Sequence, residues 1–218
     1  FSILATTSAN RGTIEAVGES QLRIWGTWDN AGGEIVARDD ATVVMQHGDH
    51  ATRITGGVLR TTGNGKIRGD GAATIEDVTV EGTLHIQRHS GLHMANTITN
   101  DGHINQGAYD GHGPATVYVD SALTFLGDGT LAIGYANEIK MRAWPDHNAV
   151  VVNGPDHTII SHGAYIGENP NYYGDQRLEF VNEGTIRCQD SLYRNEFRTA
   201  GAGFVNRGTV VIEPSPSF

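Results

Sequence analysis

Residues 182–188 carry the pattern that decides the fold: Asn182-Glu183-Gly184-Thr185-Ile186-Arg187-Cys188. A polar turn is followed by Thr and then by alternating apolar and polar residues. Alternation with a period of two places apolar side chains on one face of a β-strand and polar ones on the other. Glycine suits a turn that needs a positive φ, and Asn tolerates the same region or bonds its own backbone. The stretch therefore predicts a tight corner followed by a short strand.

The same pattern returns along the chain, at 10–16, 81–86, 100–104, 128–133 and 206–212, with looser copies at 32–35 and 56–59. The glycines that mark it are Gly12, Gly33, Gly57, Gly82, Gly102, Gly129, Gly184 and Gly208. Successive markers are 20 to 27 residues apart, and the gap of 55 between Gly129 and Gly184 fits two longer repeats. One coil of a parallel β-helix, with three short strands and three corners, needs about this length. The period is too short for propeller blades, and the repeats lack the helical half of most α-solenoids.

The columns of the aligned repeats predict an inward face. The residue two after the glycine is always apolar: Ile14, Leu84, Ile104, Leu131, Ile186 and Val210. The residue four after it is apolar except at Gln106, and this column makes Cys188 a core residue. We therefore expect a single-domain, right-handed parallel β-helix (β-solenoid) over residues 1–218. It would have about nine coils, a length of roughly 40 Å, and Asn or Thr ladders at its corners. An antiparallel sandwich is the alternative, but it has no reason to repeat one corner.

Composition agrees with this fold and excludes several functions. The chain has 29 Gly but six Pro in 218 residues, as many short strands with tight turns require. A net charge of -10 argues against a nucleic-acid partner, because phosphate binding needs clustered Lys and Arg. No apolar run reaches the ~18–20 residues of a membrane span. The chain starts at Phe1 without Met, which is expected of a processed product, a cut fragment or an incomplete sequence.

Residues 157–167 and 180–186 resemble the repeats of large bacterial exoproteins of the filamentous-haemagglutinin and autotransporter-passenger adhesin type. Such repeats read as phrases similar to "TI-x-G-x-G-x-IG … N-x-GTI". The resemblance implies secretion, display at the cell surface, and adhesive or scaffold roles. Irregular coil lengths and ten His depart from those repeats and argue against a pure spacer role.

Few residue patterns in the sequence indicate metal binding or catalysis. His85, His89 and His93 are spaced by four, but His85 falls on a predicted strand, so no metal site and no cofactor are predicted. Parallel β-helices include polysaccharide lyases and glycoside hydrolases, whose carboxylates converge in a groove. The aspartates that could stack across coils are Asp39, Asp40, Asp70, Asp77 and Asp120. Turn residues are the simpler interpretation of these aspartates, and no catalytic residue is assigned.

Function is expected where the repeat fails. The longer, irregular coils at 134–180 carry the candidate binding residues Trp144, His147, Tyr172, Tyr173 and Asp175. Exposed rings beside polar groups suit a surface glycan or a protein, although they could simply cover a widened coil.

The two ends are the second such place, because a solenoid exposes unpaired strands unless it is capped. Phe1, Ile3, Leu4 and Phe218 are candidate assembly residues. They fit either an excised part of a longer solenoid or copies stacked head to tail into a fibre. The leading hypothesis is a non-enzymatic, extracellular structural or adhesive protein. The alternative is a polysaccharide-active enzyme or a glycan-binding module.

Overall fold

A computed structural model describes residues 1–46, 51–87, 90–106, 115–133, 139–143, 148–162, 165–167, 178–189, 198–200 and 203–213. These residues form strands and turns, and no helix occurs among them. Accordingly, this part of the chain contains no helix with the length and apolarity of a membrane span. The prediction of an all-β protein is confirmed for the described residues.

The strands stack in three columns, which we call faces 1, 2 and 3. Face 1 consists of the first parts of β1 (Ser2–Ala9) and β3 (Gln21–Asp29), then β5 (Thr42–Met45), β8 (Lys66–Gly69), β11 (Thr83–Ile86), β13 (His103–Gln106), β15 (Thr130–Ile133), β18 (Thr158–Ser161), β21 (Thr185–Cys188) and β24 (Thr209–Ile212). Face 2 consists of the second parts of β1 and β3, then β6 (Arg53–Thr55), β9 (Ala72–Glu76), the first parts of β12 (Gly91–Asn100) and β14 (Thr116–Leu126), β16 (Ile139–Ala143), β19 (Tyr165–Gly167) and β22 (Arg198–Ala200). Face 3 consists of β2 (Thr13–Ala16), β4 (Glu34–Arg38), β7 (Val58–Thr62), β10 (Thr79–Glu81), the second parts of β12 and β14, β17 (Ala149–Asn153), β20 (Leu178–Asn182) and β23 (Phe204–Asn206).

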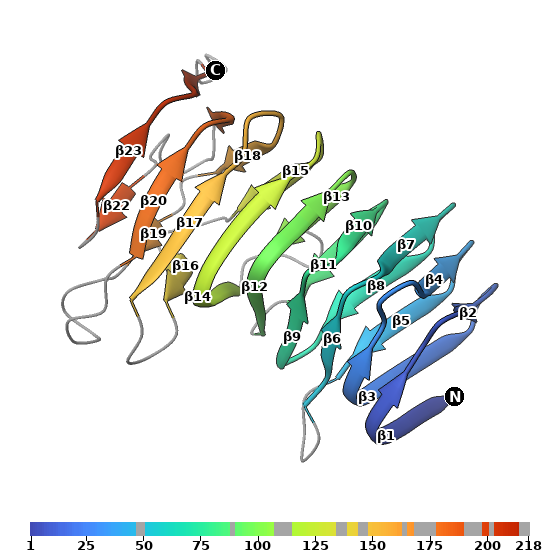
Figure 1. Cartoon of the computed structure of the whole chain (residues 1–218). Coiled ribbons are helices and arrows are strands. Elements are labelled where there is room, and N and C mark those ends of the chain that lie inside the picture. The colour runs from blue at the N-terminus through green and yellow to red at the C-terminus, as the bar shows by residue number, and fades with distance from the viewer. Residues whose placement is uncertain are drawn as a thin grey trace.

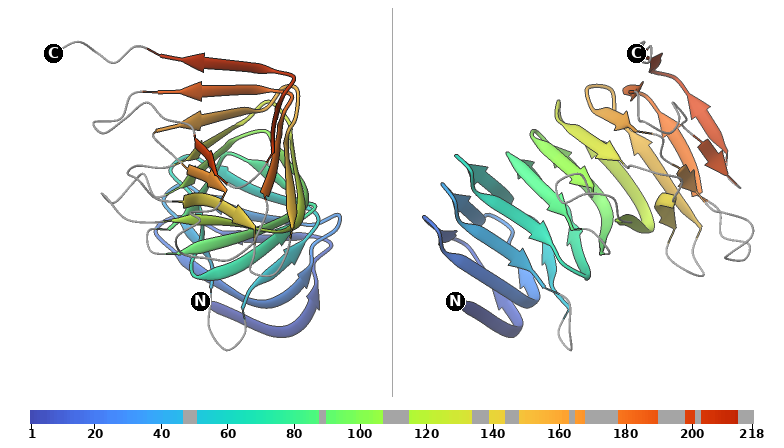
Figure 2. Two further views of the ribbon diagram at one scale, coloured as in Figure 1. Left: turned by 90° about the vertical axis from the view of Figure 1, so that its left-hand side faces the viewer. Right: turned by 180° about the vertical axis from the view of Figure 1, so that it is seen from behind.

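Every pairing between successive strands of a face is parallel, so the chain winds as a β-solenoid of about six turns. Figures 1 and 2 show the coils stacked from β1 at one end to β23 at the other. A parallel solenoid is thus confirmed. Its right-handedness, its count of about nine coils and its single domain stay predictions.

The predicted inward face is confirmed along the interior of the described solenoid. One continuous column of face 1 joins Leu22, Val43, Ile67, Leu84, Ile104, Leu131, Ile159 and Ile186, all buried. Cys188, four residues after its marker glycine, belongs to the same core cluster. At the last rung the column ends in Val210, which is 41% exposed because no further described strand covers it.

The alignment of the repeats on their marker glycines is wrong at one step, between Gly57 and Gly82. Gly12, Gly33 and Gly57 precede strands of face 3, but Gly82 precedes β11 of face 1. The position that stacks on Val58, just after Gly57, is Thr79. The marker therefore moves from the corner before face 3 to the corner before face 1. The physical reason is that a polar turn with glycine is determined by a few local residues, so it fits any corner of the coil.

The predicted Asn ladders exist, and they lie at both of these corners. Near the start, Asn10 Nδ2 donates to Asn30 Oδ1 (2.8 Å). Later, Asn153 Nδ2 donates to Asn182 Oδ1 (2.8 Å), and Asn182 Nδ2 donates to Asn206 Oδ1 (2.7 Å). A Thr ladder runs beside the second corner, through Thr130, Thr158, Thr185 and Thr209. These amides satisfy backbone carbonyls that the corners leave inside the coil.

Candidate functional site

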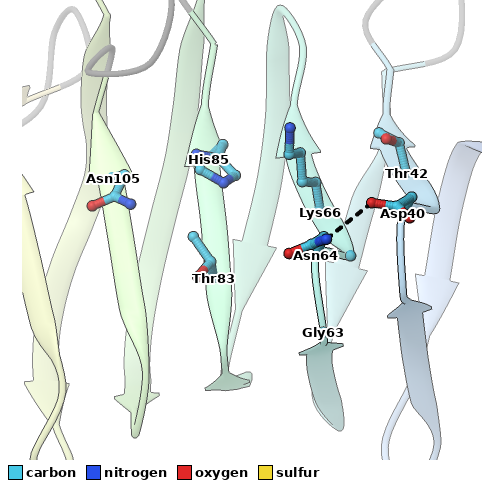
Figure 3. A pocket seen from close by; sticks show the side chains of 9 residues that line it. Asp40, Thr42, Gly63, Asn64, Lys66, Thr83, His85 and Asn105 are labelled. Atoms are coloured by element: carbon cyan, nitrogen blue, oxygen red, sulfur yellow. Dashed lines mark hydrogen bonds between the residues drawn. The ribbon is translucent and has the colours of Figure 1, made fainter.

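A groove of about 440 Å³ lies on the outer side of face 1. It crosses four consecutive coils, from β5 through β8 and β11 to β13, and its long direction follows the solenoid axis (Figure 3). Its lining is mostly polar: Asp40, Thr42, Gly63, Asn64, Gly65, Lys66, Thr83, His85 and Asn105. At ~4.8 Å per strand, the three steps between these coils cover about 14 Å, enough for a short stretch of a linear polymer.

Two stacked turns form one wall of the groove. In each turn a backbone N–H donates to the carbonyl three residues earlier, from Ala41 to Arg38 (3.0 Å) and from Gly65 to Thr62 (3.1 Å). Asn64 Nδ2 donates to Asp40 Oδ1 of the coil before it (3.1 Å). A Cβ on Gly65 would overlap the backbone around the Ala37 carbonyl, so glycine is needed for this close stacking. The turns therefore fix Asp40 and Asn64 side by side at the edge of face 1.

The strands themselves supply the floor. On each of them, alternate side chains enter the core while the intervening ones point outward into the groove. Figure 3 shows His85 and Asn105 side by side on neighbouring strands and the Lys66 amine farther from the corner than either of them, while Asn64 and Thr83 lie nearer the corner. The groove thus has two rows of hydrogen-bonding groups that run parallel to the axis, one containing the Lys66 amine and one containing the Asp40 carboxylate.

Three of the site residues predicted from sequence, Phe1, Ile3 and Leu4, belong to the described part of the chain. Trp144, His147, Tyr172, Tyr173, Asp175 and Phe218 all lie outside the described residues, as does part of the predicted irregular coils at 134–180. They stay predictions. Of the predicted end residues, Phe1 and Leu4 are 89% and 58% exposed, whereas Ile3 packs partly against the core.

The aspartates considered for an enzyme do not gather in one place. Only Asp40 among them lines the groove described here. Asp77 accepts hydrogen bonds from Asn96 and from the backbone N–H of Thr97, as a turn residue does. Asp70 follows β8, with its carboxylate 4.0 Å from Arg68, and Asp120 pairs with His93 on face 2. Asp40, Asp70, Asp77 and Asp120 therefore lie in different surroundings, at separate places on the solenoid.

A second cluster lies on the outer side of face 2. His93 Nδ1 is 2.7 Å from Asp120 Oδ1, and its ring lies 4.9 Å from that of Tyr118. Arg142 donates to the Tyr118 hydroxyl (2.9 Å) and lies over the same ring. Gly91 leaves room for this ring, which any side chain there would overlap. Of the three histidines spaced by four, His85 lies on face 1 and His93 on face 2, and His89 lies outside the described residues. No group of three metal-binding side chains occurs in the described residues.

Sequence reasoning missed the groove and also missed the buried His157. This histidine is fully buried between Asn100 and Asn153, inside the Asn ladder. Burial lowers the pKa of His157 to about 4. No other repeat has a histidine at the position of His157, so the repeat pattern did not predict that this side chain would be buried.

Fold and groove together define a parallel β-solenoid with a polar groove on one outer face. No family model matches the chain, and no curated protein and no solved structure is significantly similar to it.

Proposed function

We propose that this chain is a non-enzymatic, extracellular adhesive β-solenoid that binds carbohydrate through the groove on face 1. The observation that carries the proposal is the groove itself, which lines up hydroxyl, amide, amine and carboxylate groups from four coils. Sugars expose hydroxyls that donate and accept hydrogen bonds, and such rows can satisfy them in series. The solenoid is proposed to have about nine coils, which the unbroken pairing of face 1 from β1 to β24 supports. It is proposed to be right-handed because connections between parallel strands nearly always are.

A linear polysaccharide fits this surface better than a small metabolite does. The groove is open and extends along the solenoid axis, whereas small-molecule sites are enclosed and mostly apolar. Strands that repeat at ~4.8 Å offer regularly spaced contacts to a polymer that also repeats. Because the wall turns are held by backbone and side-chain hydrogen bonds, the site is already ordered before a ligand arrives.

The test is a glycan array followed by calorimetry on the best ligand. Each hydrogen bond contributes about 1 kcal/mol, so the double variant Asn64→Ala/Asn105→Ala should weaken binding roughly thirtyfold. The matched control is Thr158→Ala/Thr185→Ala, whose residues continue the outer row of Thr83 on face 1 but lie outside the groove. A signal on no glycan, or equal affinity in the double variant and the wild type, would contradict the proposal.

We further propose that the exposed terminal rungs stack against a second copy of the chain. Val210 and Ile212 continue the inward columns above Ile186 and Cys188, yet they are 41% and 69% exposed. At the other end Leu4 on β1 and Phe1 just before this strand are exposed, and the first part of β1 belongs to face 1. Stacking β24 of one copy on β1 of the next would add a parallel pair on this face and bury apolar surface.

Electron microscopy and sedimentation at rising concentration test this second proposal. Filaments, or linear oligomers that Ile212→Asp abolishes, are expected. A monomer at all concentrations would overturn it and would point instead to further coils of a longer solenoid as the cover.

A further inference from the structure

The chain contains two Asn-Gly sequences, Asn64-Gly65 and Asn153-Gly154. An asparagine in this position can react with its own backbone, because glycine has no Cβ that keeps its nitrogen away from the side-chain carbonyl carbon. The two reacting groups belong to neighbouring residues, so they meet without a second molecule. Both sequences occupy a corner between face 3 and face 1, after β7 and after β17. Their local chemistry is therefore the same, and the surrounding fold decides which of them reacts.

The Asn153-Gly154 corner is held by its neighbouring coils. Asn153 is fully buried, its Nδ2 donates to Asn182 Oδ1 (2.8 Å), and its Oδ1 accepts from His157 Nδ1 (2.6 Å). The backbone N–H of Gly154 donates to the carbonyl of Phe125 in the coil before it (2.9 Å). A reaction here would first have to break bonds between coils in the interior of the solenoid. Opening of that kind costs nearly as much free energy as unfolding, so the fold protects this corner.

The Asn64-Gly65 corner is held within its own turn. Asn64 is exposed and follows Gly63, whose φ is 59°. The backbone N–H of Gly65 donates to the carbonyl of Thr62 in the same turn (3.1 Å), and the Asn64 amide bonds to Asp40 at the rim of the groove (3.1 Å; Figure 3). Opening this one turn frees the nitrogen of Gly65 while the flanking strands stay paired, and such local opening needs little free energy.

We propose that Asn64 is a site of spontaneous deamidation and that this modification alters the wall of the groove. The nitrogen of Gly65 gives its proton to hydroxide and attacks Asn64 Cγ, and the new C–N bond closes a five-membered succinimide ring. The bond from Cγ to Nδ2 breaks, and the leaving nitrogen takes a proton from water and departs as ammonia. A second water then opens the ring at one of its two carbonyls, which leaves aspartate or isoaspartate. In sum, one water is consumed, one ammonia is released, and nothing is oxidised or reduced.

The product changes the wall at the contact that joins its two turns. The Asn64 amide, which donates to Asp40 Oδ1, is replaced by a carboxylate, so two like charges face each other and one hydrogen bond is lost. Isoaspartate also lengthens the backbone beside Gly65, which already packs so closely on the Ala37 carbonyl that a Cβ would overlap it. The stacked turns should therefore lose their order. The effect on ligand binding rests on the proposed carbohydrate function, whereas the modification itself does not.

The experiment incubates the folded chain at pH 8.5 and 37 °C and follows both corners by peptide mapping with mass spectrometry. Asn64 should deamidate at least about tenfold faster than Asn153, because the second corner must open between coils. In urea the two rates should converge, since the fold no longer protects either corner. Asn64→Gln is the matched control: it keeps the amide but would have to close a six-membered ring, so it should stay unmodified. Equal rates in the folded chain, or no product at Asn64, would overturn the proposal.

The variant Asn64→Asp, which carries the charge of the product, tests the effect on the groove. Hydrogen exchange at the N–H of Gly65 should be faster than in the wild type, and equal protection would contradict a weakened wall. Affinity for the best glycan should fall roughly fivefold, as expected for one lost hydrogen bond, and unchanged affinity would contradict the link to binding. If neither protein binds any glycan, the carbohydrate function is wrong, and the mapping and exchange results still decide whether Asn64 is the modified site.

Discussion

His157 lies stacked on Phe125 inside the solenoid, with ring centroids 4.9 Å apart and planes inclined by 10°. Its two nitrogens have opposite roles. Asn153 Nδ2 donates to Asn182, so its Oδ1 accepts from His157 Nδ1 (2.6 Å). His157 Nε2 then accepts from the amide of Asn100 (3.0 Å). Both bonds hold with a neutral ring, and protonation of Nε2 would place two donors against each other.

We therefore expect stability to fall as the pH drops from about 6.5 to 4. Burial lowers the pKa of His157 to about 4. The unfolded chain takes up this proton near pH 6.5, so the stabilising effect is complete above that pH and is lost on acidification. At about 1.4 kcal/mol per pKa unit, the loss by pH 4 is about 3 kcal/mol. Urea unfolding at pH 7, 5.5 and 4.5 measures it.

The variant His157→Asn isolates this effect. Burial also lowers the pKa of His162, and carboxylates titrate near pH 4, so the wild-type profile has several contributors. These contributors are common to both proteins, and their effects cancel in the difference. The variant should lose less stability than the wild type between pH 7 and 4.5. Parallel profiles would show that His157 does not titrate differently in the folded state.

Gly57 and Gly12 both mark repeats in the sequence, but alanine should affect them differently. Gly57 has a φ of 71°, and a Cβ there would overlap the carbonyl oxygens of Asn30 and Gly33. Gly12 has no heavy atom within 4 Å of such a Cβ and no positive φ. Gly57→Ala should therefore cost roughly 2 kcal/mol or more, and Gly12→Ala should change stability by no more than about 0.5 kcal/mol. Thermal unfolding followed by circular dichroism compares them. Similar losses in the two variants would contradict the stacking of this corner.

The sequence predicts the inward columns well because burial is a local property of alternation. Ile186 and Cys188 could be placed inside from seven residues alone. It predicts the groove poorly, because Lys66, His85 and Asn105 become neighbours only when the length of each coil is known. The coil from Ile67 to Leu84 takes 17 residues, while that from Leu131 to Ile159 takes 28. The repeated turns look alike at every corner. The sequence therefore does not show which residues of successive coils stack on each other.

Cys188 should be unreactive in the folded protein. Its side chain is buried in the core cluster, and desolvation raises the pKa of the thiol, so the reactive thiolate is rare. A thiol reagent such as iodoacetamide should modify it slowly at pH 8 in buffer and rapidly in urea. Fast labelling without urea would place the thiol in solvent and would contradict the inward column of face 1.

Asn182 should be sensitive to substitution, because it bonds to both neighbouring asparagines of the second ladder. Its Oδ1 accepts from Asn153, and its Nδ2 donates to Asn206 and to the carbonyl of Thr209 (3.2 Å). It is fully buried, so no water replaces these bonds when the amide is removed. Asn182→Ala should cost about 3 kcal/mol, since it leaves buried partners unsatisfied. Asn64→Ala, at an exposed corner with one bond to Asp40, is the control and should cost less than about 1 kcal/mol. Denaturant unfolding gives both values. Equal costs would mean that the ladder adds nothing beyond what an exposed turn provides.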